Sequence, residues 1–85
     1  MRENPKPHEL FTHFKGNKYQ IVTLAENSED GSTCVVYQAM YGDFKTYVRP
    51  LAMFMSEVDH DKYPLAQQNW RFEPYEGELV DEKNK

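Results

Sequence analysis

The feature of this sequence that most constrains its fold is a dense run of strand-forming residues in the middle of the chain. From Cys34 to Val58, 16 of 25 residues are hydrophobic, and valine and tyrosine are frequent in the first half of that run. These residue types favour β-strands. Gly42 and Pro50 interrupt the run, because glycine permits a tight turn and proline cannot donate to a central ladder. The run therefore predicts short strands joined by turns.

Alternation and turn signals locate the longer strands. Residues 18–24 alternate with the period of two that is typical of a strand, and the polar residues 26–32 with their glycine predict a loop. A second strand is predicted over 33–41. A two-residue hairpin turn at 42–43 joins it to a third strand over 44–49, which stops at the following proline.

The remaining segments predict shorter elements. Residues 51–54 are too few for a stable helix and predict a single 3-10 turn. Residues 57–58 start a short fourth strand, and residues 70–75 form a last strand at a sheet edge, where a proline is tolerated. Within the second strand we place Val36 in the core, since it lies in the densest apolar stretch.

Together these elements predict a mainly β protein: a small barrel or roll of four to five antiparallel strands with one short 3-10 turn. A chain of 85 residues leaves room for one domain, which we place at residues 8–75. Residues 1–7 are rich in charge and proline, and residues 76–85 are poor in apolar side chains. We therefore expect both termini to be flexible.

Charge and composition exclude several classes of function. The net charge is −4, with the excess negative charge in the last third of the chain and no cluster of lysine and arginine, so nucleic-acid binding is not expected. No apolar run is long enough to span a membrane, and residues 1–7 do not resemble a secretory signal. The lone Cys34 forms no internal disulfide, which favours the cytoplasm.

Three motifs, at residues 13–19, 35–42 and 48–54, resemble those of a small bacterial family. They read His-Phe-Lys-Gly-Asn-Lys-Tyr, Val-Val-Tyr-Gln-Ala-Met-Tyr-Gly and Val-Arg-Pro-Leu-Ala-Met-Phe, and together they are similar to the domain-of-unknown-function family sixteen-fifty-three over about residues 11–59. The resemblance implies an SH3-like β-barrel and brings no established activity. The chain departs from the family at Asn27, where members usually have histidine, and at Tyr47, where many have tryptophan.

An arginine and two tyrosines form the first candidate site. Strand alternation puts Arg49 on the same face as Tyr47, and Tyr37 joins them if the second and third strands pair. A guanidinium beside two rings suits bidentate binding of a carboxylate or phosphate. Aromatic residues of SH3-like barrels also bind extended or methylated peptides. The alternatives are that Arg49 bonds carbonyls or pairs with Asp43 or Glu29, and that the rings only fill the core.

A histidine offers a second possibility. Histidine side chains usually titrate near neutral pH, so His13 could serve as a general base, with Glu29 or Asp43 as its orienting acid, which would make the protein a small hydrolase. The alternative is that its ring nitrogens bond nearby backbone and hold the first turn. Asp59, His60 and Asp61 have the donor types of a metal site, but a solvated turn is the better interpretation.

The sequence therefore favours a non-catalytic binding module whose candidate residues are His13, Tyr37, Tyr47 and Arg49. A hydrolase using His13 is the alternative. We expect no cofactor and no metal. The partner is an unidentified protein or small-molecule ligand, and the sequence leaves the oligomeric state open.

Overall fold

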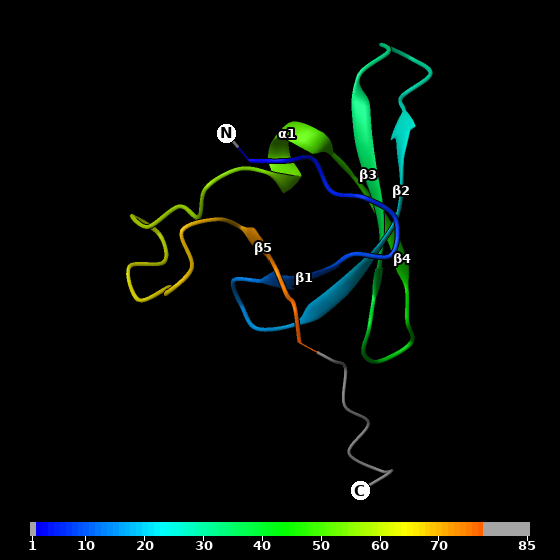
Figure 1. Ribbon diagram of the computed structural model, residues 1–85. Helices are drawn as coiled ribbons and strands as arrows, with labels where there is room; N and C mark the ends of the chain where they lie inside the picture. The colour runs from blue at the N-terminus through cyan, green and yellow to red at the C-terminus, as the bar shows by residue number, and fades with distance from the viewer. Residues whose placement is uncertain (1, 78–85) are drawn as a thin grey trace, which may run out of the picture.

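A single five-stranded antiparallel sheet forms the framework of the computed structural model, which describes residues 2–77 (Figure 1). Along the sheet the strands follow the order β4-β3-β2-β1-β5. The mainly β, antiparallel prediction is confirmed, with the larger of the two expected strand numbers. The strands are β1 (Leu10–His13), β2 (Lys18–Glu26), β3 (Thr33–Ala39), β4 (Thr46–Pro50) and β5 (Phe72–Pro74).

Three strands and one edge position match the prediction closely. β2, β3 and β4 cover most of the ranges expected for them, and β4 ends at Pro50. β5 lies at one edge of the sheet and carries Pro74, as expected for the last strand. The predicted two-residue hairpin is longer, because paired residues end at Gln38 and Thr46. Both Gly42 and Phe44 have positive φ in this loop.

β1 was not predicted, and residues 57–58 form no strand of their own. The four residues of β1 contain a single buried side chain, Phe11, so their pattern carries little strand signal. β1 nevertheless pairs with both β2 and β5. Glu57 makes only an isolated bridge to Trp70.

The sheet curls around its core. β3 and β5 are separated by two strands, which in a flat sheet would put them about 14 Å apart. The ring centroids of Tyr37 on β3 and Phe72 on β5 are only 5.5 Å apart. A register shift in β2 between Ile21 and Thr23 marks a bulge at Val22, and bulges increase local twist and bend a strand. The curl brings β3 close to β5 over one core, as predicted for a roll.

The facing of β3 is the reverse of the prediction at one position. Val35 is fully buried, whereas Val36 is partly exposed, so the prediction that Val36 points into the core is wrong. Val35, Tyr37 and Ala39 form the inward face of the strand. Both valines have the same propensity, and only the register of the sheet distinguishes them.

Residues 51–54 form the expected single turn, α1 (Leu51–Phe54), which is α-helical. The backbone N–H of Met55 donates to the carbonyl of Leu51 at 2.9 Å, the spacing of an α-turn in place of the predicted 3-10 turn. Phe54 is fully buried, and its ring stacks on Phe72 with centroids 4.1 Å apart. The turn therefore closes the core over β5.

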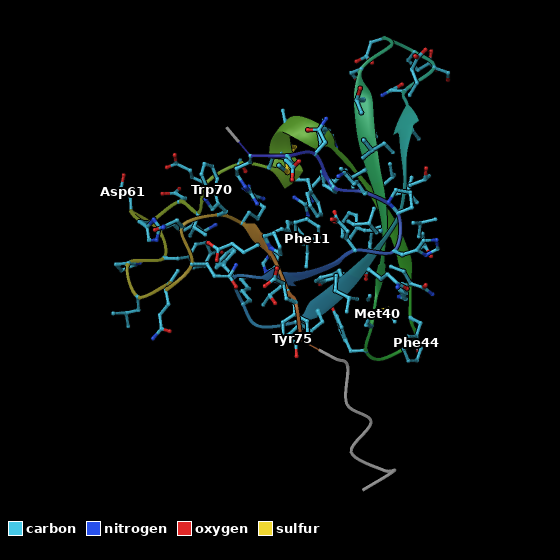
Figure 2. The ribbon with its side chains drawn as sticks, viewed as in Figure 1. Phe11, Met40, Phe44, Asp61, Trp70 and Tyr75 are labelled. Atoms are coloured by element: carbon cyan, nitrogen blue, oxygen red, sulfur yellow. The ribbon has the colours of Figure 1, made fainter. Side chains whose placement is uncertain are left out.

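A long loop and the N-terminal segment complete the described residues. The loop between Val58 and Trp70 extends away from the sheet, with Asp61 near its tip, whereas Phe11 points into the core (Figure 2). Pro5 is buried, and the guanidinium of Arg2 donates to the carbonyls of Met55 and Phe72.

Residues 2–7 thus make contacts that the sequence did not suggest, and their flexibility stays a prediction. Most of the predicted C-terminal tail, residues 78–85, lies outside the described residues. Among residues 2–77 no helix has the length and apolar character needed to cross a bilayer.

Candidate functional site

The pairing of β3 with β4 places three of the predicted site residues together. Tyr37 and Tyr47 are directly opposite each other across the two strands, and their ring centroids are 5.7 Å apart. Arg49 lies two residues further along β4, on the same face, and its Nε donates to the hydroxyl of Tyr37 at 3.1 Å. The hydrogen bond holds the guanidinium against the sheet at the edge strand.

β2 supplies a further ring to this cluster. Tyr19 lies with its ring centroid 5.5 Å from that of Tyr37 and 6.5 Å from that of Tyr47, in edge-to-face arrangements. Its hydroxyl shares a hydrogen bond of 2.9 Å with the hydroxyl of Tyr41. Burial, then this bond and the neighbouring phenols, raise the pKa of Tyr19 well above its usual value. Tyr19 is therefore a neutral, fixed aromatic wall.

Together these side chains line a pocket of about 230 Å³, which we call the aromatic pocket. Strand pairing contributes its walls, and Phe72 of β5 joins the buried core to the pocket because it contacts both Tyr19 and Phe54. The lining residues are His13, Tyr19, Tyr37, Tyr47, Arg49 and Phe72.

His13 is held as a neutral ring. Its Nδ1 accepts the backbone N–H of Lys15 at 3.1 Å, so the single proton of the neutral imidazole lies on Nε2. Burial, followed by the positive charges of Lys15, Arg49 and Arg71, lowers the pKa of His13 to about 4. The ring also stacks on Phe14 and meets Phe72 edge-on, with centroids 4.5 and 4.9 Å apart. His13 therefore offers the pocket an N–H donor and an aromatic surface.

The charge inside the aromatic pocket is positive. Arg49 is the charged residue of its lining, and no carboxylate lines it. Within residues 2–77 the terminal guanidinium nitrogens of Arg49 have no hydrogen-bond partner, and neither Asp43 nor Glu29 pairs with it. The predicted pairing of Arg49 with one of these carboxylates is not observed. Two donor groups are left facing a site walled by rings.

The structure brings all four predicted site residues into one pocket. Two lining residues were not among the predicted four. Tyr19 belongs to the alternating run 18–24, and its place on the same face as the buried Ile21 is the signal that could have added it. Phe72 lies far along the chain from the other residues and reaches the pocket only through the pairing of β5 with β1. No sequence pattern predicts the pairing of β5 with β1.

The acids proposed to orient His13 lie elsewhere. Glu29 is in the loop that joins β2 to β3, and Asp43 is in the loop that joins β3 to β4. His60 contacts the carbonyl of Gln68 at 3.1 Å in the long loop. Within the part of the chain that the structure describes, no group of three or more histidine, cysteine, aspartate or glutamate residues is placed to hold a metal ion.

The fold and the pocket define a small, single-sheet β-domain with one strand-built aromatic site. The profile of the family described as "Protein of unknown function (DUF1653)" matches residues 9–74, which is most of the chain, and the protein belongs to that family. The resemblance of its three motifs is thereby confirmed. A search of curated proteins gives no match.

One solved structure supports the same fold. The crystal structure of a protein of this family from Bordetella bronchiseptica superposes with a TM-score of 0.67. The two chains are 28% identical, and the match covers 87% of this chain and 91% of that one. The similarity thus extends over most of both chains, while the narrower SH3-like description stays a prediction.

Proposed function

We propose that this protein is a non-catalytic binding module whose aromatic pocket binds a carboxylate attached to a flat apolar group. The observation that carries the proposal is Arg49. Its Nε is fixed by the hydroxyl of Tyr37, and its two terminal nitrogens have no partner among the described residues. A guanidinium fixed at one nitrogen presents the other two in the planar fork that matches a carboxylate.

The size of the pocket sets the size of the ligand. Its volume is about 230 Å³, whereas pockets for whole cofactors and drug-sized molecules usually exceed about 300 Å³. A cavity of about 150 Å³ accommodates benzene. The aromatic pocket therefore suits a single ring with a carboxylate, either a small molecule or the end of a peptide.

The charge of the pocket selects an anion over a cation. Aromatic cages that bind methylated lysine depend on rings without a competing positive charge. Here Arg49 lies among the rings, and the positive charges of Lys15 and Arg71 also act on His13. A quaternary ammonium group would be repelled, so a methylated peptide is a poorer ligand than a carboxylate.

The hydrolase alternative is less well supported. A general base needs a free lone pair, but the Nδ1 lone pair of His13 accepts the Lys15 N–H, and Nε2 carries the ring proton. A pKa of about 4 makes the ring a weak base at neutral pH. No carboxylate lines the aromatic pocket to orient it.

The expected cytoplasmic location is supported by Cys34, which is buried as a free thiol.

The test is a titration of the isotope-labelled protein followed by NMR, with benzoate, acetate and tetramethylammonium as probes. Benzoate is expected to shift the side-chain signals of Arg49 and Tyr47 and to bind more tightly than acetate. Tetramethylammonium is expected not to displace bound benzoate. The variant Arg49→Lys keeps the charge and loses the fork, so its affinity for benzoate should fall at least about tenfold.

Lys6→Gln is the matched control. It removes one positive charge from an exposed residue that does not line the aromatic pocket, and it should leave benzoate affinity unchanged. Binding of tetramethylammonium at the same signals, or an Arg49→Lys variant that binds benzoate as well as the original protein, would contradict the proposal.

A further inference from the structure

A second cavity, of about 260 Å³, lies next to His13 and uses different side chains. His13 is the one lining residue that the two cavities have in common. The new cavity is formed where the turn after β1 meets the long loop and the residue before β5. Its charged and aromatic lining consists of Phe14, Lys15, Asp59, Lys62, Tyr63 and Arg71.

Arg71 supplies an unexplained donor at this place. Its Nε is fully buried and has no hydrogen-bond partner within residues 2–77. Its backbone is fixed on both sides, because its N–H donates to Ser56 and its carbonyl accepts from Phe14. A buried N–H of a charged group that lacks a partner is costly, so such groups usually have a function or a ligand.

The other charges of the cavity also favour an anion. Lys15 and Lys62 place their ammonium groups 5.2 and 5.5 Å from the centre of the Tyr63 ring, and neither forms an ion pair with a described residue. Asp59 is the one carboxylate of the lining, and an oxygen of its side chain already accepts the backbone N–H groups of Asp61 and Lys62. The formal charge of the lining is 3 − 1 = +2, from Lys15, Lys62 and Arg71 against Asp59.

An apolar surface continues this cavity. A neighbouring pocket shares Phe14, Lys15, Lys62 and Tyr63 and adds Pro64, Leu65 and Ala66. Leu65 is 92% exposed, and the rings of Phe14 and Tyr63 lie with their centroids 5.0 Å apart. We call the two together the cationic groove: a positive end at Arg71 and an apolar end at Leu65.

We infer that the cationic groove binds a phosphate monoester, with the phosphate at Arg71, Lys15 and Lys62 and an attached flat group against Tyr63 and Leu65. Three cations opposed by one carboxylate match the charge of a phosphate, about −1.5 to −2 at neutral pH, better than that of a carboxylate. Because Nε of Arg71 is closed to solvent, the phosphate meets the terminal nitrogens of this guanidinium, which have no hydrogen-bond partner among the described residues. The inference is separate from the carboxylate proposal, because apart from His13 the two sites have different walls.

Phenyl phosphate, inorganic phosphate and phenol are the probes that test it, with NMR of the labelled protein as the readout. Phenyl phosphate should shift the backbone signals of Lys15, Lys62 and Tyr63 and the Nε–H signal of Arg71, and should bind at least about tenfold more tightly than inorganic phosphate. Lys62→Gln should weaken binding several-fold. Lys6→Gln, which removes the same charge outside the groove, should leave binding unchanged.

Asp59→Asn gives a test of opposite sign. The asparagine keeps the oxygen that caps the loop and loses the negative charge, so phenyl phosphate should bind more tightly to this variant. The inference is overturned by equal affinity for phenyl phosphate and inorganic phosphate, by no binding of either, or by signal shifts confined to Tyr19, Tyr37 and Arg49. The last outcome would assign phosphates to the aromatic pocket.

Discussion

The aromatic pocket and the cationic groove meet at His13 and are built in different ways. Strands supply most of the pocket: Tyr37 and Tyr47 face each other by sheet register, and Phe72 belongs to both pocket and core. A turn and a long loop supply most of the groove, whose lysines are exposed. One site therefore depends on the stability of the sheet, and the other depends mainly on side chains outside the central core cluster.

The two arginines show the same difference at the level of single groups. Arg49 has one nitrogen hydrogen-bonded to Tyr37, so part of its side chain already stabilises the folded protein. Arg71 has a buried nitrogen with no partner among the described residues. A group that is satisfied without a ligand and a group that is not should respond oppositely to removal. That contrast separates a structural contribution from a binding contribution without knowledge of either ligand.

The largest expected effect is the difference in stability between a variant at Phe72, in the aromatic pocket, and a variant at Leu65, at the apolar end of the cationic groove. Phe72 is 1% exposed and contacts Phe54, Tyr37 and Tyr19, so Phe72→Ala should lower the free energy of unfolding by about 3–5 kcal/mol. Leu65→Ala removes an exposed side chain and should change it by less than about 0.5 kcal/mol. Urea midpoints of the two variants measure both values. A Phe72→Ala protein of nearly unchanged stability would show that the pocket is not continuous with the core.

The next prediction compares the two arginines directly. Arg49→Met leaves the buried Tyr37 hydroxyl without its observed partner, so the free energy of unfolding should fall by about 1–3 kcal/mol. Arg71→Met removes a buried donor that has no described partner and should be neutral or stabilising by up to about 1 kcal/mol. The measurement is again the urea midpoint, without ligand. Destabilisation by Arg71→Met would mean that this arginine is a structural residue.

Only the β4 part of the site followed from the sequence. Alternation placed Tyr47 and Arg49 on one face of β4. The predicted two-residue turn at 42–43, however, would have set Tyr37 opposite Val48. The observed loop around Phe44 is longer, and it shifts the register by one residue, so that Tyr37 lies opposite Tyr47.

The parts that sequence reasoning missed depend on contacts between distant residues. The bulge at Val22 changes which residues of β2 face inward, and the register of the curled sheet decides that Val35 and not Val36 is buried. Phe72 reaches the pocket only because β5 pairs with β1. The unpartnered nitrogen of Arg71 is a property of three segments packed together, and no local pattern in the sequence encodes it.

The smallest expected effect concerns His13, the residue that both sites share, and it appears as a dependence of stability on pH. The folded protein lowers the pKa of His13 from 6.5 to about 4, so between these values the unfolded chain binds a proton that the folded protein does not. The contribution of His13 is therefore fully present above pH 6.5 and is lost as the pH falls toward 4. Because the ring is only partly buried, solvent screening keeps the loss modest.

His13→Asn isolates this contribution, since the asparagine oxygen can still accept the Lys15 N–H and the residue does not titrate. Urea midpoints measured at several pH values between 7 and 4 should fall less steeply for the variant than for the original protein. Bound benzoate or phenyl phosphate should reduce the same slope in the original protein, because an anion in either site offsets the positive charges that oppose protonation of His13. Parallel curves for the two proteins would show that His13 keeps its ordinary pKa in the folded protein. The positive charges of Lys15, Arg49 and Arg71 would then have no effect on the ring that lies between the two sites.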